Sequence, residues 1–189
     1  ATSTLDYAWE MGAAYVPPAF PPHFDGHLAP LRGDDDPLII AHTPTNPAIC
    51  HTTEFMHEAR AVGAVVRFGH QKPHAEIIAL KRTCNAAFDH LRGSFSVNTL
   101  EATALGLVPL VGLRPEYRDL MCSQGFTPPP FPALHTLEGL REWLGRLADD
   151  PKLTRDLQIA ARLWQHHFYT DARPAIEAFY RGLVDRSRS

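Results

Sequence analysis

Hydrophobic and polar positions after Pro37 follow two alternating patterns. Short apolar runs bounded by turn residues are typical of buried strands, and apolar residues at helical spacing are typical of amphipathic helices. Because the two patterns alternate, they predict strand–helix–strand units that build a parallel sheet. The predicted strands are 38–42, 64–68, 86–88 and 107–112.

The predicted helices are marked by residues that favour helix starts and stops. Thr52 or Thr53 can cap a helix that ends at Gly63, and Pro73 fits the first turn of the next one. A third helix is predicted over 96–105. Beyond a proline-rich loop at 126–132, three amphipathic helices are expected, with apolar positions Leu137/Leu140/Leu144/Leu147, Leu153/Leu157/Ala160/Trp164 and Ile176/Phe179/Leu183.

Residues 1–37 differ from the rest because prolines cluster in them, as at Pro17-Pro18 and Pro21-Pro22. Proline restricts itself and the preceding residue to extended backbone, so an irregular leader is expected that packs against a domain surface. The acidic run 34–36 is interpreted as solvated linker. Residues 38–189 are expected to form one α/β domain, with a Rossmann-like parallel sheet flanked by helices and a helical C-terminal region.

Composition narrows the class of protein. The chain has 189 residues, of which 44% are hydrophobic, and a formal net charge of −3 with no basic stripe, so nucleic acid is not an indicated partner. No apolar run approaches the ~20 residues of a membrane-spanning helix. Cys50, Cys84 and Cys122 have no paired spacing, which favours reduced, mostly buried thiols in a cytoplasmic protein.

The segment 94–106 carries the strongest candidate chemistry, because it follows a predicted strand and opens a helix. Unpaired N–H groups at a helix N-terminus attract phosphate, and the small residues around Ser96 allow a ligand to approach. Glu101 lies about one turn into this helix, where a carboxylate can accept hydrogen bonds from ribose hydroxyls. The alternative is a capping box over 98–101, in which Glu101 serves its own helix.

A second candidate segment, 42–46, lies at the carboxyl end of the first predicted strand. Ligands of open α/β sheets bind beyond the carboxyl ends of the strands, so this loop and the 94–98 turn are expected to flank one crevice. Pro44, Thr45 and Asn46 are also ordinary turn residues, which is the alternative interpretation of this loop.

Three motifs together resemble the C-terminal domain of group 1 glycosyltransferases of the GT-B fold. They are Ile-Ala-His-Thr-Pro-Thr-Asn at 40–46, Phe-Asp-His-Leu-Arg-Gly at 88–93, and Leu-Glu-Ala-Thr-Ala-Leu-Gly-Leu-Val-Pro-Leu-Val at 100–111. The resemblance implies a nucleoside diphosphate sugar as donor substrate, with no separate cofactor. It places the substrate against Thr45, Asn46, Phe68, Gly69, His70, Ser96, Val97, Asn98, Thr99 and Glu101.

Within that set, the resemblance implies diphosphate at 96–99, ribose at Glu101 and the base at 68–70. It also implies that residues 1–37 link this domain to an acceptor-binding lobe, supplied by a longer chain or by a protein partner. Two positions depart from the family. Gly93 stands where a partner glutamate is common, and Cys50 stands where a lysine often neutralises the diphosphate.

Catalytic residues are not identified by the sequence. Arg92, Arg67, Lys72 and His51 are candidates for the missing positive charge, each with a solvated surface role as the alternative. The histidine pairs at 70/74 and 166/167 lack a completing set of ligands, so no metal site is expected.

The leading hypothesis for function is the donor-binding half of a glycosyltransferase whose acceptor is unknown. The first alternative is a non-catalytic nucleotide-sugar-binding or regulatory module that retains the fold. A further alternative is an unrelated nucleotide-sugar enzyme, such as an epimerase.

Overall fold

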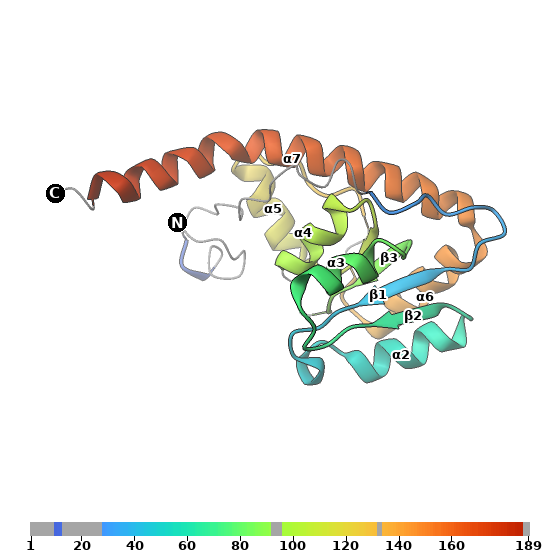
Figure 1. The fold of residues 1–189 in the computed structure, drawn as a ribbon. Helices are drawn as coiled ribbons and strands as arrows, with labels where there is room; N and C mark the ends of the chain where they lie inside the picture. The colour runs from blue at the N-terminus through green and yellow to red at the C-terminus, as the bar shows by residue number, and fades with distance from the viewer. Residues whose placement is uncertain (1–9, 13–27, 92–95, 132–133, 187–189) are drawn as a thin grey trace.

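The computed structural model describes residues 10–12, 28–91, 96–131 and 134–186. These residues form a four-stranded parallel sheet with helices on both faces (Figure 1). The strand order is β2-β1-β3-β4, and the strands are β1 (Ile39–His42), β2 (Val65–Phe68), β3 (Ala86–Phe88) and β4 (Val108–Leu110). The Rossmann-like α/β class predicted from the sequence is confirmed.

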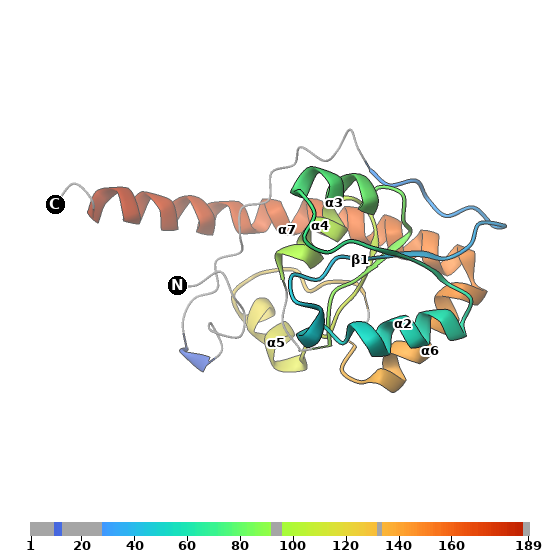
Figure 2. The same cartoon turned by 60° about the horizontal axis from the view of Figure 1, so that its bottom comes forward.

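Helices cover the sheet in two layers. The helices are α2 (Thr52–Ala61), α3 (His74–Lys81), α4 (Val97–Ala104), α5 (Pro115–Ser123), α6 (Leu137–Asp149) and α7 (Pro151–Arg186), with a short 3-10 helix η2 (Pro47–Ile49). Figures 1 and 2 show α3 and α4 on one face of the sheet and α2 and α6 on the other, while α7 packs against β4, α4 and α6. Among described residues, no helix combines the length and apolar character needed to cross a membrane.

The sheet register brings the ends of the strands together on one edge. His42 lies opposite Phe68 on one side and Phe88 on the other, so the carboxyl ends of β1, β2 and β3 are level. Loops that leave this edge lead into η2, α3 and α4. Any site built at this edge therefore combines residues that are distant in sequence.

Two glycines end helices as the sequence predicts. Gly63 follows α2 and Gly106 follows α4, and both have the positive φ of the left-handed region, at 72° and 75°. The start of α2 differs from the prediction, because His51 rather than Thr52 or Thr53 is its N-cap, with φ 53° and no side-chain cap. Thr52 instead directs its hydroxyl to His42.

The C-terminal region also differs from the prediction. One continuous helix, α7, runs from Pro151 to Arg186 and extends beyond the rest of the fold (Figure 1), where two separate helices were expected. Helix α5 was not predicted at all. Its two buried residues, Tyr117 and Met121, pack in a core cluster with Trp164 and Phe168 of α7.

The described end of the leader, residues 28–37, is bound tightly to the domain. Ala29 donates its N–H to the Leu105 carbonyl at 2.8 Å, and Gln158 of α7 bonds the backbone of Pro30 and Arg32. The guanidinium of Arg32, only 4% exposed, donates to the Leu147 and Ala148 carbonyls at the end of α6. The proline pairs Pro17-Pro18 and Pro21-Pro22 of the predicted leader lie outside the described residues.

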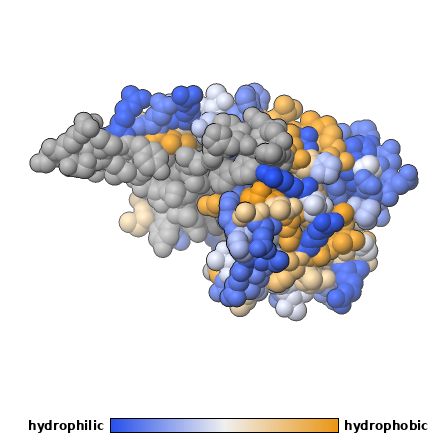
Figure 3. All heavy atoms as spheres, in the orientation of Figure 1, coloured by the Kyte–Doolittle hydropathy of each residue, from blue (hydrophilic) through white to orange (hydrophobic). Residues whose placement is uncertain are grey.

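The face seen in Figure 3 carries polar side chains together with several patches of hydrophobic ones. Strand β2 is one of the two outer strands of the sheet, and its Val65 and Phe68 are 46% and 42% exposed. The cysteines follow the prediction only in part, because Cys50 and Cys84 are buried and Cys122 is exposed. Burial raises the pKa of the Cys84 thiol to about 11, which suits an unreactive packing residue.

Candidate functional site

A pocket of about 380 Å³ lies at the carboxyl edge of the sheet, between the loops after β1 and β2 and the first turns of α3 and α4. We call it the narrow pocket. It brings together residues from three distant segments, as expected for an open α/β sheet. Its lining residues are Thr43, Pro44, Thr45, Gly69, Gln71, Lys72, His74, Ile77, Val97, Asn98 and Glu101.

Five residues of the predicted substrate site line this pocket: Thr45, Gly69, Val97, Asn98 and Glu101. Sequence reasoning missed Thr43 and Ile77 as lining residues. It considered His74 only as a metal ligand. Their positions follow from the topology, since the segments after β1 and β2 leave the same edge of the sheet.

Two basic side chains bind the carboxylate of Glu101. Its Oε2 lies 2.6 Å from Nζ of Lys81, and its Oε1 lies 2.8 Å from Nε2 of His74. Both partners belong to α3, one at each end of the helix. The capping-box interpretation of 98–101 is wrong, because Ser96 is the N-cap of α4 and its hydroxyl accepts from the N–H of Thr99. The carboxylate of Glu101 faces α3 and the pocket rather than its own helix start.

Asp89, the residue after β3, anchors the first turn of α4. Its Oδ2 accepts hydrogen bonds from the hydroxyls of Ser96 and Thr99, the latter at 2.6 Å. Its Oδ1 accepts from the amide of Asn98 at 3.1 Å. The amide oxygen of Asn98 in turn accepts from Thr43 at 2.9 Å. This network joins the ends of β1 and β3 to the start of α4, so the pocket wall is fixed from behind.

The other predicted substrate residues do not line the narrow pocket. Ser96 and Thr99 direct their hydroxyls at Asp89, and Thr99 is only 1% exposed. Asn46 caps η2 by accepting from the N–H of Ala48, and Nδ1 of His70 lies 3.0 Å from the Pro44 carbonyl. Phe68 is partly exposed on the edge strand β2. Their contact with substrate remains a prediction.

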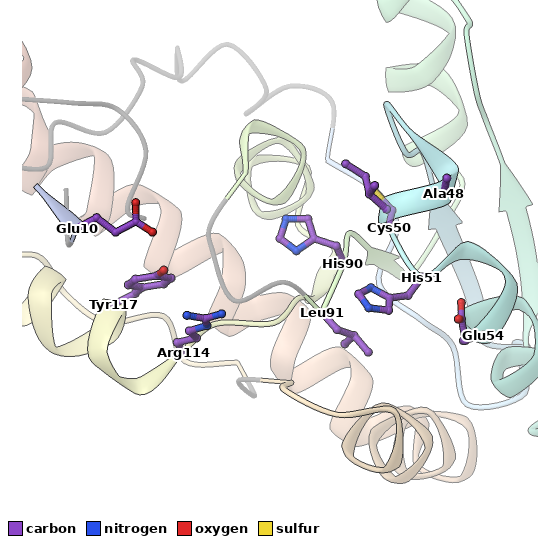
Figure 4. A pocket seen from close by; sticks show the side chains of 10 residues that line it. Glu10, Ala48, Cys50, His51, Glu54, His90, Leu91, Arg114 and Tyr117 are labelled. Carbon is purple, nitrogen blue, oxygen red and sulfur yellow. The ribbon is translucent and has the colours of Figure 1, made fainter. Parts of the chain in front are cut away.

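A second pocket, of about 840 Å³, opens at the same edge of the sheet; we call it the wide pocket (Figure 4). Its lining residues are Glu10, Ala48, Ile49, Cys50, His51, Glu54, His90, Leu91, Arg114 and Tyr117. Arg114 points toward the interior of this space, on the side opposite Cys50 (Figure 4). The Nδ1 atom of His51 is buried and has no hydrogen-bond partner in the described part of the chain. The wide pocket therefore has several polar lining side chains, with Arg114 and Cys50 on opposite sides of it (Figure 4).

The remaining candidate cations differ in position. Lys72 lines the narrow pocket and lies 3.6 Å from Glu76. Arg67 donates to the Thr83 hydroxyl on the surface. Arg92 and Gly93 lie outside the described residues. No group of His, Cys, Asp or Glu among the described residues could hold a metal ion.

His42 is buried at the end of β1, and the segment that follows it contributes residues to both pockets. Its Nδ1 lies 3.1 Å from the Phe88 carbonyl, which can only accept, and its Nε2 lies 2.8 Å from the Thr52 hydroxyl. A neutral ring that donates from Nδ1 and accepts at Nε2 satisfies both contacts. Burial is the main cause that lowers the pKa of His42 from its usual 6.5, while the Phe88 carbonyl and Asp89 act in the opposite direction. The ring is thus kept neutral at physiological pH.

Because the pKa of His42 is lowered in the folded state, we expect the stability of the protein to depend on pH. The contribution of His42 to stability is complete above the unfolded value of 6.5 and is lost as pH falls below it. His42→Asn keeps a donor for the Phe88 carbonyl but cannot titrate. We expect urea midpoints, measured from about pH 7.5 to about pH 5.5, to fall less steeply in this variant than in the wild type. Equal slopes would contradict this role, since the other histidines titrate in both proteins.

Comparison with solved structures identifies proteins that share this fold. The chain matches a TarM variant from S. aureus, solved in complex with Fondaparinux, alpha-GlcNAc-glycerol and UDP, with a TM-score of 0.59 and 10% identity. It also matches an O-GlcNAc transferase variant from Thermobaculum terrenum, with a TM-score of 0.52 and 14% identity. The matches cover 89% and 84% of this chain, but only 39% and 37% of the other two.

The sequence itself matches no family model and no curated protein. At 10% and 14% identity, the two structural matches establish fold rather than activity. They confirm, at the level of fold, the resemblance found in the motifs at 40–46, 88–93 and 100–111. The chain has the fold of one domain of a GT-B glycosyltransferase.

Proposed function

We propose that this chain is the donor-binding domain of a glycosyltransferase and takes a nucleoside diphosphate sugar as its substrate. The observation that carries the proposal is the narrow pocket, where the carboxylate of Glu101 meets the loops after β1 and β2. Carboxylates at the carboxyl edge of a parallel sheet recognise ribose through its hydroxyls. Glu101 therefore accepts hydrogen bonds from the ribose, and the base lies toward Gly69 and Phe68.

The comparisons support this proposal in two ways. The Thermobaculum terrenum protein is an O-GlcNAc transferase by name, and the TarM structure contains UDP. The chain corresponds to a little over a third of each of them, so the acceptor site is assigned to a lobe or partner outside this domain. A cytoplasmic location, expected from the cysteines, is part of the same proposal.

The diphosphate requires positive charge or N–H donors to stabilise it as a leaving group. Cys50, at the family's lysine position, lines the wide pocket, and so does Arg114. The first turn of α4 is less suited to phosphate, because the carboxylate of Asp89 already accepts from Ser96 and Thr99 there. We therefore assign the diphosphate to the side of the wide pocket, with Arg114 as its cation.

A non-catalytic nucleotide-sugar-binding module is the second candidate function. Cys50 favours it, because an arginine on another element does not reproduce the lysine's position in the loop after β1. The two candidates share the donor site and differ only in transfer. Sugar release or transfer by the domain together with an acceptor lobe supports the first, and binding without turnover supports the second.

Glu101→Gln tests the donor site. The amide retains the size of the carboxylate and an oxygen for Lys81, but it loses one acceptor for a ribose diol. We expect its Kd for the preferred nucleotide to rise by about 5- to 150-fold, which corresponds to about 1–3 kcal/mol. Calorimetry with UDP, GDP and ADP and their sugars would first identify the ligand and then compare the variant.

The matched control is Glu177→Gln, on the exposed part of α7, where Glu177 pairs with Arg173 and Arg181. This variant should bind like the wild type. If the wild type binds none of the nucleotides, the proposed function is wrong. If Glu101→Gln is folded and binds normally, the ribose role of Glu101 is wrong, although another donor geometry would survive.

A further inference from the structure

Lys81, the last residue of α3, is a charged side chain with no exposed surface. An ammonium removed from water is costly unless its donors are satisfied by well-placed acceptors. Nζ of Lys81 lies 2.6 Å from Oε2 of Glu101 and 2.5 Å from Oδ1 of Asn98. Two of its three donors are thus directed at one carboxylate and one amide.

Lys81 does not line the narrow pocket, but both of its acceptors do. It therefore lies behind the pocket wall and fixes two side chains that face the pocket. The two carboxylate oxygens of Glu101 therefore have different surroundings. Its Oε2 is bound by the buried Lys81, whereas its Oε1 is bound by His74, whose side chain is 68% exposed.

The second acceptor of Lys81 is held just as closely. The Oδ1 atom of Asn98 accepts from both Lys81 and Thr43, so the amide must present its nitrogen to Asp89. This fixes which way the amide faces. One buried lysine thereby sets the orientation of two pocket residues that are a single helical turn apart on α4.

We propose that Lys81 is a positioning residue for nucleotide recognition: it binds one carboxylate oxygen of Glu101, so that the outer oxygen is available to the ribose. The exposed imidazole of His74 is the partner that ribose hydroxyls replace. This inference rests on the proposed donor site and adds the residue that makes Glu101 competent. Among the described residues that line the pocket, Lys72 is a further charged group, and its Nζ lies 3.6 Å from Glu76.

Lys81→Met tests this role through nucleotide affinity. Without the ammonium, Oε2 of Glu101 and Oδ1 of Asn98 lose the donor that they share, so neither side chain is held in the orientation that the ribose requires. We expect nucleotide affinity to fall about tenfold. Lys81→Arg, which keeps the charge and has donors for both acceptors, should restore most of the wild-type affinity. The measurement is calorimetric Kd with the nucleotide that the wild type binds.

Lys152→Met is the matched control, because Lys152 forms an exposed ion pair with Asp156 on α7 and should bind like the wild type. If Lys81→Met is folded and shows the wild-type affinity, the inference is wrong while the donor site stands. If the wild type binds no nucleotide, the proposed function itself fails.

Lys81→Gln provides a second variant if Lys81→Met does not fold, since the amide can still donate to Asn98. If neither folds, calorimetry of the wild type in two buffers of different ionisation enthalpy decides. The proposed complex, in which Glu101 accepts from both Lys81 and the ribose, requires no proton uptake when nucleotide binds at about pH 6.5. Net uptake of about one proton would overturn the inference.

Discussion

Replacing Phe55 by alanine is expected to lower the free energy of unfolding by about 3–5 kcal/mol. Phe55 of α2 has no exposed surface, and its ring stacks on Phe88 of β3 with centroids 4.2 Å apart. It also contacts the ring of His42, with centroids 5.0 Å apart. The variant therefore loses buried apolar area and leaves a cavity where α2 meets the sheet.

Urea denaturation followed by circular dichroism measures this loss. Phe68→Ala is the matched control, because Phe68 lies on the edge strand and is 42% exposed. We expect the control to cost about 1 kcal/mol or less. A similar cost for both variants would show that the contact between α2 and the sheet is not a main source of stability.

The strands and α4 could be predicted because their signals are local. Strand β3 is Ala86–Phe88 as predicted, and the other three strands lie within their predicted ranges. Each is a short apolar run between turn residues, and all three residues of β3 and of β4 are buried. Burial on both faces of a parallel sheet is what such continuous runs indicate.

The long helix α7 could not be predicted from its separate halves. The sequence pattern was divided at Trp164 and Ile176, yet Phe168 and Ala172 continue the same buried stripe between them at four-residue spacing. Pro174 did not end the helix. A proline removes one backbone hydrogen bond, and packing of the stripe on either side outweighs that local cost.

The candidate site was predictable in position but not in its contacts. Thr45 and Glu101 meet at one pocket because strand topology determines where loops lie. Nothing local in the sequence indicates that Lys81, an unremarkable lysine near the end of a helix, pairs with Glu101. That contact depends on how α3 packs beside α4, and two helices in tertiary contact leave no common periodicity in the sequence.

Asp89→Ala is expected to combine a loss of stability with a loss of ligand binding. Asp89 is 6% exposed and accepts from Ser96, Asn98 and Thr99, so its removal leaves donors at the start of α4 without their acceptor. A buried polar group left unpaired costs about 1–3 kcal/mol, and we expect a total of about 3 kcal/mol from this cluster.

Denaturation in urea and hydrogen exchange of the α4 amides would measure this effect, with faster exchange expected in the first turn of α4. Asp156→Ala is the control, because Asp156 forms a surface pair with Lys152 and should change stability by less than about 0.5 kcal/mol. Equal stability of the two variants would show that Asp89 does not anchor α4.

Nucleotide binding by Asp89→Ala also shows whether a residue that supports the site, without contacting the ligand, affects affinity. Asp89 does not line the narrow pocket, but Asn98 does and loses its bond to Asp89. If nucleotide affinity falls in Asp89→Ala while the protein is still folded, the loss must come from the orientation of Asn98 and the first turn of α4. Unchanged affinity would mean that Lys81 and Thr43 suffice to hold Asn98, since both still bind its amide oxygen.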